Sequence, residues 1–508
     1  MCIRDRFYRP RRKAYASLSI ILVFSSLVLL SACSEDKDYS SPFTVRAIAE
    51  VQDLTGDPTT DRDLPSIADA KAQLGKKLFF TKGLGGQMDT ACASCHHPML
   101  AGGDNLSLAI GVDATDSDLL GTGRAHISGS PIVPRNAQTT FNVGIYDQVL
   151  FHDGRVESLN KLTGFNGADN PDDSVADLGI STPDTGLDPD TNVFIADPDA
   201  GANLPTAQAR FPVTIIEKMR GAYLPGVTND EVRTGLATGL PTLLENGITS
   251  NTWATEFAAA YDGDTTITYD KIAEAIGEYE RSQVFVDNPW KAFLGGDDNA
   301  ISESARRGAV LFFFPSFSGG AGCVSCHRGD FFTDEQFHVI AMPQVGPGMG
   351  DGDDGTDDFG RFRVTNVETQ RYAFRTPSLL NVTETGPWGH AGGYTTLEAA
   401  VRHHLNPQTA IDNYDFSQLE SSVQATNMKL NTQKAMDQLT ANRAAGLFTI
   451  RDIELTDDEV ADLLAFLETL TDPCIKDRTC MAPWIADCSV SDPDGLCLTG
   501  KDESGNSL

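Results

Sequence analysis

One five-residue pattern occurs twice in this chain and constrains its fold more than any other feature. It stands in "ACASCHHP" and again in "GCVSCHRG", and each copy reads Cys-x-x-Cys-His. This pattern is the attachment signal of haem c, in which two thiols bond to the porphyrin and the adjacent histidine ligates the iron. The predicted haem-binding residues are Cys92, Cys95 and His96 in the first copy and Cys323, Cys326 and His327 in the second.

Two other kinds of protein site also contain a Cys-x-x-Cys pair. A thioredoxin-type dithiol needs a βαβ context, and a zinc site needs a second close pair of ligands. The sequence offers neither, so two covalently bound haem c groups are the favoured interpretation.

The two copies belong to a longer internal repeat. "AQLGKKLFF" (Ala72–Phe80) precedes the first copy and "ARRGAVLFF" (Ala305–Phe313) precedes the second. Both segments have apolar residues at helical spacing and a glycine that lets another helix approach closely. Downstream, Phe141–Leu159 has a counterpart in Leu380–Leu397. Since strand signals are sparse, we predict a mainly α protein with two cytochrome c-like haem domains in tandem.

Helix and linker signals set the expected boundaries. "YDKIAEAIGEYERSQVF" (residues 269–285) predicts an amphipathic helix, and residues 455–473 predict another that begins with a capping box of Thr456 and Glu459. We expect an N-terminal domain over residues 61–285, a linker over 286–300 and a C-terminal domain over 301–472. Residues 161–205, rich in Gly, Asp and Pro, predict a long surface insertion.

Four cysteines crowd into the last 36 residues, the tail of residues 473–508; they are Cys474, Cys480, Cys488 and Cys497. We interpret this tail as a cap held by disulfides, with three possible pairings. A metal site is the alternative, although the tail contains no histidine.

The N-terminus reads as an export signal. Basic residues precede the apolar run Leu18–Leu30, and "LSAC" ends at Cys33. This stretch resembles a bacterial lipoprotein signal, with residues 1–33 as signal peptide, Cys33 as the lipidated residue and Ser34 favouring the outer membrane. Residues 34–60 then predict a polar tether, and the protein is expected in the periplasm. A plain cleaved signal and an uncleaved membrane anchor are the alternatives.

The formal net charge of -32 excludes one class of partner. Binding to nucleic acid requires clustered Lys and Arg, so nucleic acid is not expected as a partner. An acidic surface keeps a protein soluble and attracts a basic protein partner.

Several further motifs carry a resemblance to a known family. From about residue 65 to residue 472 the chain resembles the bacterial di-haem cytochrome c peroxidases, which include the MauG-type enzymes. Besides the two haem motifs, the matching segments are "RNAQTTFN" (Arg135–Asn142), "FHDGR" (Phe151–Arg155), "FTDEQFH" (Phe332–His338) and "FRTPSLLNV" (Phe374–Val382). The resemblance implies a peroxidatic haem at His96 and an electron-accepting haem at His327.

The resemblance also implies residues around the first haem. Typical members have a blocking distal histidine after the first motif, where this chain has Val112, so the first haem is expected to be open. His97 or His126 are alternative ligands. The family uses a Gln and a Glu near a proline for acid–base chemistry, which predicts catalytic roles for Gln208 and Glu217.

For the second haem, typical peroxidases place a methionine ligand shortly before the Phe-Arg/Lys-x-Pro segment. Here Tyr372 precedes it, which is the choice implied by the MauG-type members. Met342 and Met349 are the alternatives. His390 is expected to form hydrogen bonds, and His403 and His404 are expected to face solvent or core.

Two further assignments concern the junction of the domains. His152 replaces the family's tryptophan between the haems and is expected to form a hydrogen-bonded bridge. Asn136 matches a calcium ligand of the family, so one calcium ion is predicted there. The acidic loop Asp351–Asp358 is expected to face it, although a solvated loop is the simpler interpretation of that segment.

Together these observations predict a di-haem c peroxidase that reduces hydrogen peroxide. A small c-type cytochrome or a copper protein is the expected electron donor. The alternatives are a MauG-like oxidase of a protein or organic substrate and a pure electron-transfer di-haem cytochrome.

Overall fold

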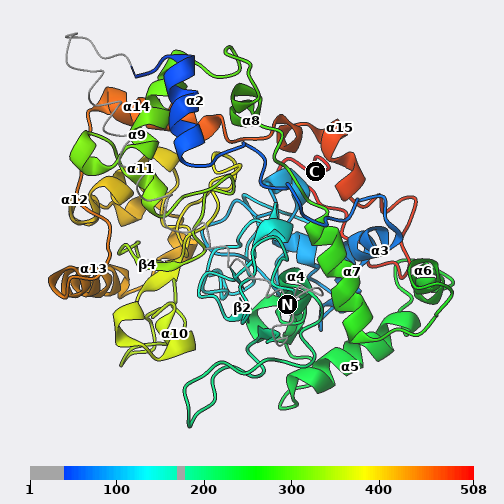
Figure 1. The fold of residues 1–508 in the computed structure, drawn as a ribbon. Helices are drawn as coiled ribbons and strands as arrows, with labels where there is room; N and C mark the ends of the chain where they lie inside the picture. The colour runs from blue at the N-terminus through cyan, green and yellow to red at the C-terminus, as the bar shows by residue number, and fades with distance from the viewer. Residues whose placement is uncertain (1–38, 169–177) are drawn as a thin grey trace, which may run out of the picture.

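The computed structural model describes residues 39–168 and 178–508 (Figure 1). The predicted signal peptide with Cys33 and the first residues of the predicted tether lie outside these ranges, as does the middle of the predicted insertion. Over the described ranges, no helix combines the length and the apolar character that crossing a membrane requires.

The protein is mainly helical, as predicted. Its α-helices are α2 (Pro42–Val51), α3 (Ala70–Phe80), α4 (Leu204–Ala209), α5 (Asn229–Gly239), α6 (Trp253–Ala260), α7 (Tyr269–Arg281), α8 (Pro289–Leu294), α9 (Glu303–Phe313), α10 (Phe362–Thr365), α11 (Leu397–Leu405), α12 (Pro407–Asp412), α13 (Met428–Ala444), α14 (Asp457–Glu468) and α15 (Arg478–Met481). Two small antiparallel sheets are formed by β1 (Val149–Leu150), β2 (Val156–Ser158) and β3 (Ile180–Ser181) and by β4 (Phe337–Val339) and β5 (Ala373–Arg375).

The predicted repeat appears as two matching helix pairs. Helix α3 packs against α7 in the N-terminal half, and α9 packs against α14 in the C-terminal half. A Cβ on Gly75 of α3 would lie 1.8 Å from the carbonyl oxygen of Ala275, and a Cβ on Gly308 of α9 would lie 1.9 Å from that of Asp462. Each pair therefore depends on a glycine at the crossing, and the expected close approach of a second helix is confirmed.

This close approach gives a testable prediction. Replacing Gly75 with alanine forces α3 and α7 apart, because the added carbon meets backbone that cannot rotate away. We expect the free energy of unfolding to fall by about 1–3 kcal/mol, as for other overpacked cores. Gly239→Ala in α5 is the control, since its added carbon meets nothing within 4 Å, and it is expected to be neutral or slightly stabilising. Denaturant unfolding of both variants measures this; equal midpoints would contradict the account.

Segments outside the predicted domains are also folded. Helix α2 lies in the predicted tether, begins at the N-cap Ser41 and packs against α9 with Val45 and Ala49 buried. The predicted linker contains α8, whose Trp290 and Phe293 are buried. Both segments carry apolar residues at helical spacing, and burying them outweighs the polar composition around them. Residues 39–60 and 286–300 therefore contain packed helices, and the assignment of 34–60 as a tether and of 286–300 as a linker stays a prediction.

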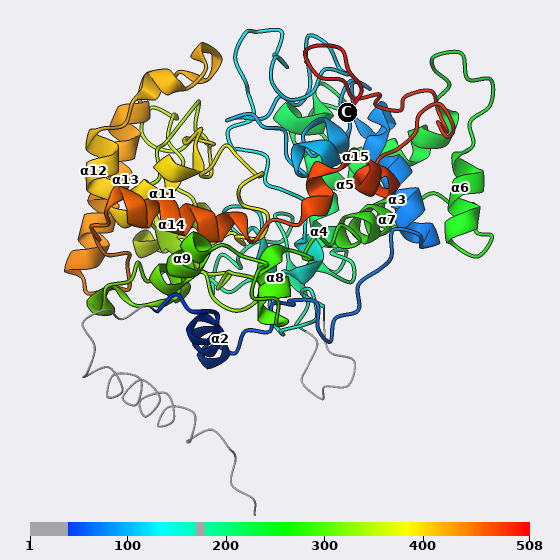
Figure 2. The same cartoon turned by 90° about the horizontal axis from the view of Figure 1, so that it is seen from above.

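The C-terminal tail returns to the N-terminal half. Figure 2 shows it in red, with α15 close to α3 and α7. Two disulfides, Cys474–Cys480 and Cys488–Cys497, confirm the disulfide interpretation of the tail.

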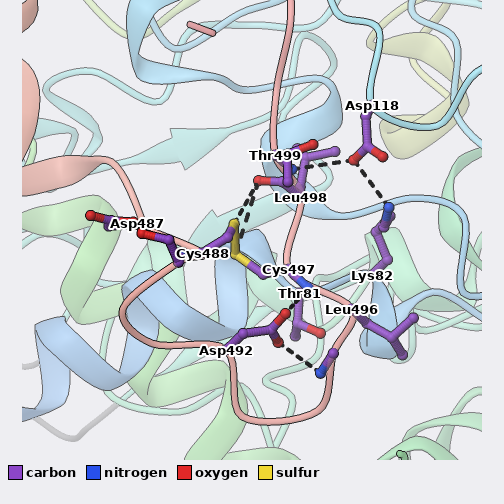
Figure 3. Close-up of a disulfide and its surroundings, with 12 residues drawn as sticks. Thr81, Lys82, Asp118, Asp487, Cys488, Asp492, Leu496, Cys497, Leu498 and Thr499 are labelled. Carbon is purple, nitrogen blue, oxygen red and sulfur yellow. Dashed lines mark hydrogen bonds and ion pairs between the residues drawn. A yellow bond between two sulfur atoms is a disulfide. The ribbon is translucent and has the colours of Figure 1, made fainter. Parts of the chain in front are cut away.

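The second disulfide holds the tail beside the chain that leads from α3 to the first haem motif (Figure 3). The Leu498 amide donates to the carbonyl of Phe80 at 2.8 Å, and the Lys82 amide donates to that of Leu496 at 2.9 Å. Lys82 Nζ lies 3.0 Å from Asp118, whose carboxylate also accepts the amide of Thr499. The tail thus fixes the segment that precedes Cys92.

Candidate haem sites

Each predicted haem motif forms a short 3-10 turn followed by its histidine. The turns are Cys92–Ser94 and Cys323–Ser325. His96 Nδ1 lies 3.1 Å from the carbonyl oxygen of Gly102, and His327 Nδ1 lies 3.0 Å from that of Phe332. With Nδ1–H donating to a carbonyl, Nε2 of each ring is left as the metal-binding nitrogen.

The side chains at both motifs fit a covalently bound haem. The four motif cysteines are free and partly accessible, whereas the four tail cysteines are paired. Burial raises the pKa of the Cys95 and Cys323 thiols to about 12, so they are held as thiols. Burial also lowers the pKa of His96 and His327 to about 4, which keeps the imidazoles neutral as metal ligation requires.

The segment after the first motif packs against the helical turn Ile216–Arg220. Cys95 Sγ donates to the carbonyl of Ile110 at 3.6 Å. A Cβ on the next residue, Gly111, would lie 2.3 Å from the carbonyl oxygen of Glu217. Val112, the residue that stands in place of a distal histidine, is 1% exposed. This packing brings the predicted acid–base segment next to the first haem motif.

Within that turn, Lys218 interacts with residues around the first haem motif, and its predicted neighbour Glu217 differs from it in this respect. Glu217 is half-buried, and its side chain forms no hydrogen bond or ion pair with any described residue. Lys218 Nζ lies 5.3 Å from the ring centre of Phe151. Burial, aided by the charge of Arg155, lowers the pKa of Lys218 to about 7, and its charge in turn lowers the pKa of His96. Gln208 lies half-buried at the end of α4.

The two alternative ligands of the first haem have other partners. His97 is buried, accepts the amide of Met99 through Nδ1 at 3.2 Å and packs edge-on against Phe80. His126 Nδ1 lies 2.6 Å from the hydroxyl of Ser128. Among the described residues, no second aromatic or imidazole ring is in contact with the ring of His96.

The second motif differs, because another imidazole faces its histidine. The ring centre of His404, on α11, lies 6.5 Å from that of His327. His404 is half-buried, and its Nδ1 lies 2.8 Å from the carbonyl of Ala400. His403 is fully buried between the hydroxyl of Tyr394 and the carbonyl of Ile340, both at 2.7 Å. The expectation of a core position thus fits His403.

The structure does not bring Tyr372 to His327. The Tyr372 hydroxyl donates to Asp357 at 2.9 Å, and the side chain borders a surface hollow with Phe359 and Lys434. Met342 packs with Tyr394, and Met349 lies in the acidic loop. The Tyr372 hydroxyl is therefore engaged by Asp357, and its assignment as an iron ligand stays a prediction.

A buried cluster of charges joins the two halves. Arg135 forms a two-pronged ion pair with Asp358 at 2.7 and 2.8 Å and contacts Asp153 at 2.6 Å. The charge of Arg135 lowers the pKa of both carboxylates against the opposing effect of burial. The acidic loop thus lies next to the segment that contains Asn136, as predicted. The contact between them is the ion pair of Asp358 with Arg135. The end of the loop is buried, so a simply solvated loop is wrong for Asp357 and Asp358.

His152 and Asn136 lie beside this cluster. His152 Nε2 lies 3.1 Å from the carbonyl of Asn136, and its own carbonyl accepts the amide of Arg375 from the C-terminal half. The Asn136 amide donates to the carbonyl of His390. Nδ2 of Asn136 donates to the carbonyl of Leu106 at 2.8 Å. His152 therefore connects the two halves by hydrogen bonds, while calcium at Asn136 stays a prediction.

The sequence analysis did not single out Lys218, and it expected His404 to face solvent or core. Lys218 follows Glu217 directly in the sequence. A comparison with the family motif that is off by one residue therefore selects the glutamate and misses the lysine. His404 carries a weak signal, because a pair of histidines on a helix does not show which one enters the core.

Comparisons with known proteins agree with this architecture. A family model described as "Di-haem cytochrome c peroxidase" matches residues 69–299. The chain is 24% identical to the methylamine utilization protein MauG of Methylorubrum extorquens over 89% of this chain and 94% of that protein. It is 24% identical to the cytochrome c551 peroxidase of Pseudomonas aeruginosa over 71% of this chain and 76% of that protein.

One solved structure shows the same fold. It is that of a MauG-like protein associated with microbial copper homeostasis, with a TM-score of 0.50 at 21% identity, covering 85% of this chain and 97% of that chain. The family implies two haem c groups, which the two motifs fit. The chain belongs to the di-haem cytochrome c peroxidase and MauG family of oxidoreductases.

Proposed function

We propose that the protein reduces hydrogen peroxide at the His96 haem with electrons that enter through the His327 haem. The observation that carries this proposal is the difference between the two sites. An imidazole lies opposite His327, whereas the residue that follows the first motif at the distal position is Val112, which cannot bind iron. An open coordination position admits peroxide, and a filled one suits electron transfer.

A haem bound at His96 would supply an iron atom at which the O–O bond of peroxide is cleaved. The protein's part is to hold this group through Cys92 and Cys95, to orient His96 through Gly102 and to move protons. Reduction of peroxide to two waters consumes two electrons and two protons. In this proposal Lys218 Nζ, neutral above about pH 7, accepts the first proton and returns it to the leaving oxygen. Gln208 and Glu217 are the other candidates for this work.

The electron donor in this proposal is a small c-type cytochrome or a copper protein of the periplasm. The charge of -32 supports a donor with a basic face, because opposite charges speed encounter. Anchoring to the outer membrane through Cys33 belongs to the same proposal, as does calcium at Asn136.

A MauG-like oxidase of a protein or organic substrate is the second candidate. It is favoured by the match to MauG over most of both chains and by Val112 after the first motif. Turnover with peroxide and a reduced cytochrome c separates the candidates. Rapid steady-state turnover supports the peroxidase, whereas a peroxide reaction without turnover of the donor supports the oxidase.

The acid–base assignment yields a prediction. Lys218→Met is expected to lower peroxide turnover by about 100-fold or more, in the range found for positioned general bases. In the unchanged protein the rate should rise as pH increases through about 7, because Lys218 must lose its proton to act as a base. The variant should lose that rise. A pH profile of both proteins measures this.

Glu217→Gln is the competing variant. It has nearly the same size and lies one residue away, but its side chain has no partner among the described residues. If Glu217→Gln removes turnover and Lys218→Met retains the pH-dependent rise, the original assignment of Glu217 is correct and that of Lys218 is not.

A further inference from the structure

His404 lies where a second axial ligand of the His327 haem would lie. Both rings engage a backbone carbonyl through Nδ1, His404 with Ala400 at 2.8 Å and His327 with Phe332 at 3.0 Å. Each ring therefore keeps Nε2 as its unengaged nitrogen. The two ring centres are 6.5 Å apart.

That separation matches two imidazoles on one metal ion. A histidine nitrogen binds a transition metal at about 2 Å, so two such nitrogens on opposite sides of one ion lie about 4 Å apart. With each ring centre about 1 Å behind its nitrogen, the centres are expected about 6 Å apart. A gap of 6.5 Å would therefore accommodate one metal ion held by both imidazoles, with no further ligand between them.

The position of His404 is fixed by its helix. The adjacent His403 is locked in the core by Tyr394 and Ile340, so α11 cannot rotate about its axis without breaking two buried hydrogen bonds. Successive helical residues point about 100° apart, so anchoring His403 directs His404 to a different face, toward His327.

The other candidate ligands are held elsewhere. Tyr372 donates its hydroxyl to the buried carboxylate of Asp357. Met342 lies in a small apolar cluster with Tyr394 and Ala400. Among the described residues, the ring of His404 lies against that of His327, whereas the contacts of Tyr372 and Met342 are made with other residues.

We infer that His404 is the sixth ligand of the His327 haem, which is thus held by two histidines. This inference deepens the proposed function, because it assigns the ligand of the electron-relay site. Two imidazoles make the iron low-spin and closed to peroxide. They also give a lower reduction potential than a histidine and a methionine give.

The test uses spectroscopy of the haem-loaded full chain. Electron paramagnetic resonance and near-infrared magnetic circular dichroism of the oxidised protein are expected to show one low-spin bis-imidazole haem. His404→Met is expected to replace that signature with a histidine–methionine one and to raise the midpoint potential of this haem. His404→Ala is expected to convert it to a high-spin haem that binds added imidazole. Covalent haem content shows that each variant has folded.

Met342→Leu and Tyr372→Phe are the matched controls and are expected to keep the bis-imidazole signal. Loss of that signal in either control, or its survival in His404→Ala, overturns the assignment. The readout is independent of turnover. A bis-imidazole signal that depends on His404 in a protein unreactive to peroxide would sink the proposed function and leave this inference standing.

Discussion

Replacing His96 with glycine is expected to lower peroxide turnover by more than about 100-fold, since even outer partners of metal ligands contribute 10–100-fold. His96 is the histidine of the first Cys-x-x-Cys-His motif and would bind the iron through Nε2, and the carbonyl of Gly102 fixes the orientation of its ring. Steady-state consumption of peroxide with reduced cytochrome c measures the loss. The low-spin spectrum of the second haem should be unchanged, and the mass of the protein should show both haems attached.

His327→Gly is the matched variant at the second motif. It is expected to stop steady-state turnover as well, because electrons no longer enter. A single exposure to peroxide should still change the spectrum of the first haem. If His96→Gly keeps the rapid peroxide reaction and His327→Gly loses it, the roles of the two haems are reversed.

Replacing Arg135 with methionine is expected to lower the free energy of unfolding by about 3–5 kcal/mol, the usual cost of breaking a buried ion pair. The change leaves Asp358, which is 2% exposed, without its two-pronged partner, and Asp153 keeps only Arg155. Denaturant unfolding of the haem-loaded protein measures the change. Since Arg135 and Asp153 belong to the N-terminal half and Asp358 to the C-terminal half, the junction should loosen first.

Arg402→Met is the control for this variant. Arg402 also contacts two carboxylates, Glu398 and Asp457, but all three side chains are largely exposed, so a loss below about 1 kcal/mol is expected. Equal losses in the two variants would contradict the account of the junction.

The buried pairs also set an acid limit on stability. Because the folded pKa values of Asp153 and Asp358 are lowered, their stabilisation is complete above the unfolded pKa of about 4. It is lost as pH falls below that value. Arg135→Met should therefore flatten the loss of stability below about pH 4.

The repeat explains why so much of the fold was predictable. Gly75 and Gly308 occupy the same place in the repeated helix segment that precedes each Cys motif, and each lies at a helix crossing in the structure. The capping box of Thr456 and Glu459 likewise begins α14 as predicted. Such features depend on interactions between residues that are close in the sequence, so the sequence pattern predicts them. The return of the tail to the segment Phe80–Lys82 has no local signal, since it depends on contacts between residues far apart in the chain.

The site was predictable only in part for the same reason. Each haem motif is a continuous stretch of sequence, so the Cys-x-x-Cys-His pattern was sufficient to predict the two cysteines and the histidine of each site. The residues proposed for the distal side of each haem lie about 80–120 residues from the motifs, and the choice between adjacent residues there depends on helix rotation. Lys218 against Glu217 and His404 against His403 are both choices of this kind. Tyr372 was favoured by its position in a family motif, while Asp357 holds its hydroxyl elsewhere.

The most direct test of the central claim is rapid mixing of the oxidised, haem-loaded protein with hydrogen peroxide, followed by absorption and freeze-quench electron paramagnetic resonance. We expect the resting protein to show one high-spin and one low-spin ferric haem. The high-spin signal should be lost first, within the mixing experiment. Two low-spin haems at rest, with no spectral change after mixing, would contradict the claim that the His96 site reacts with peroxide.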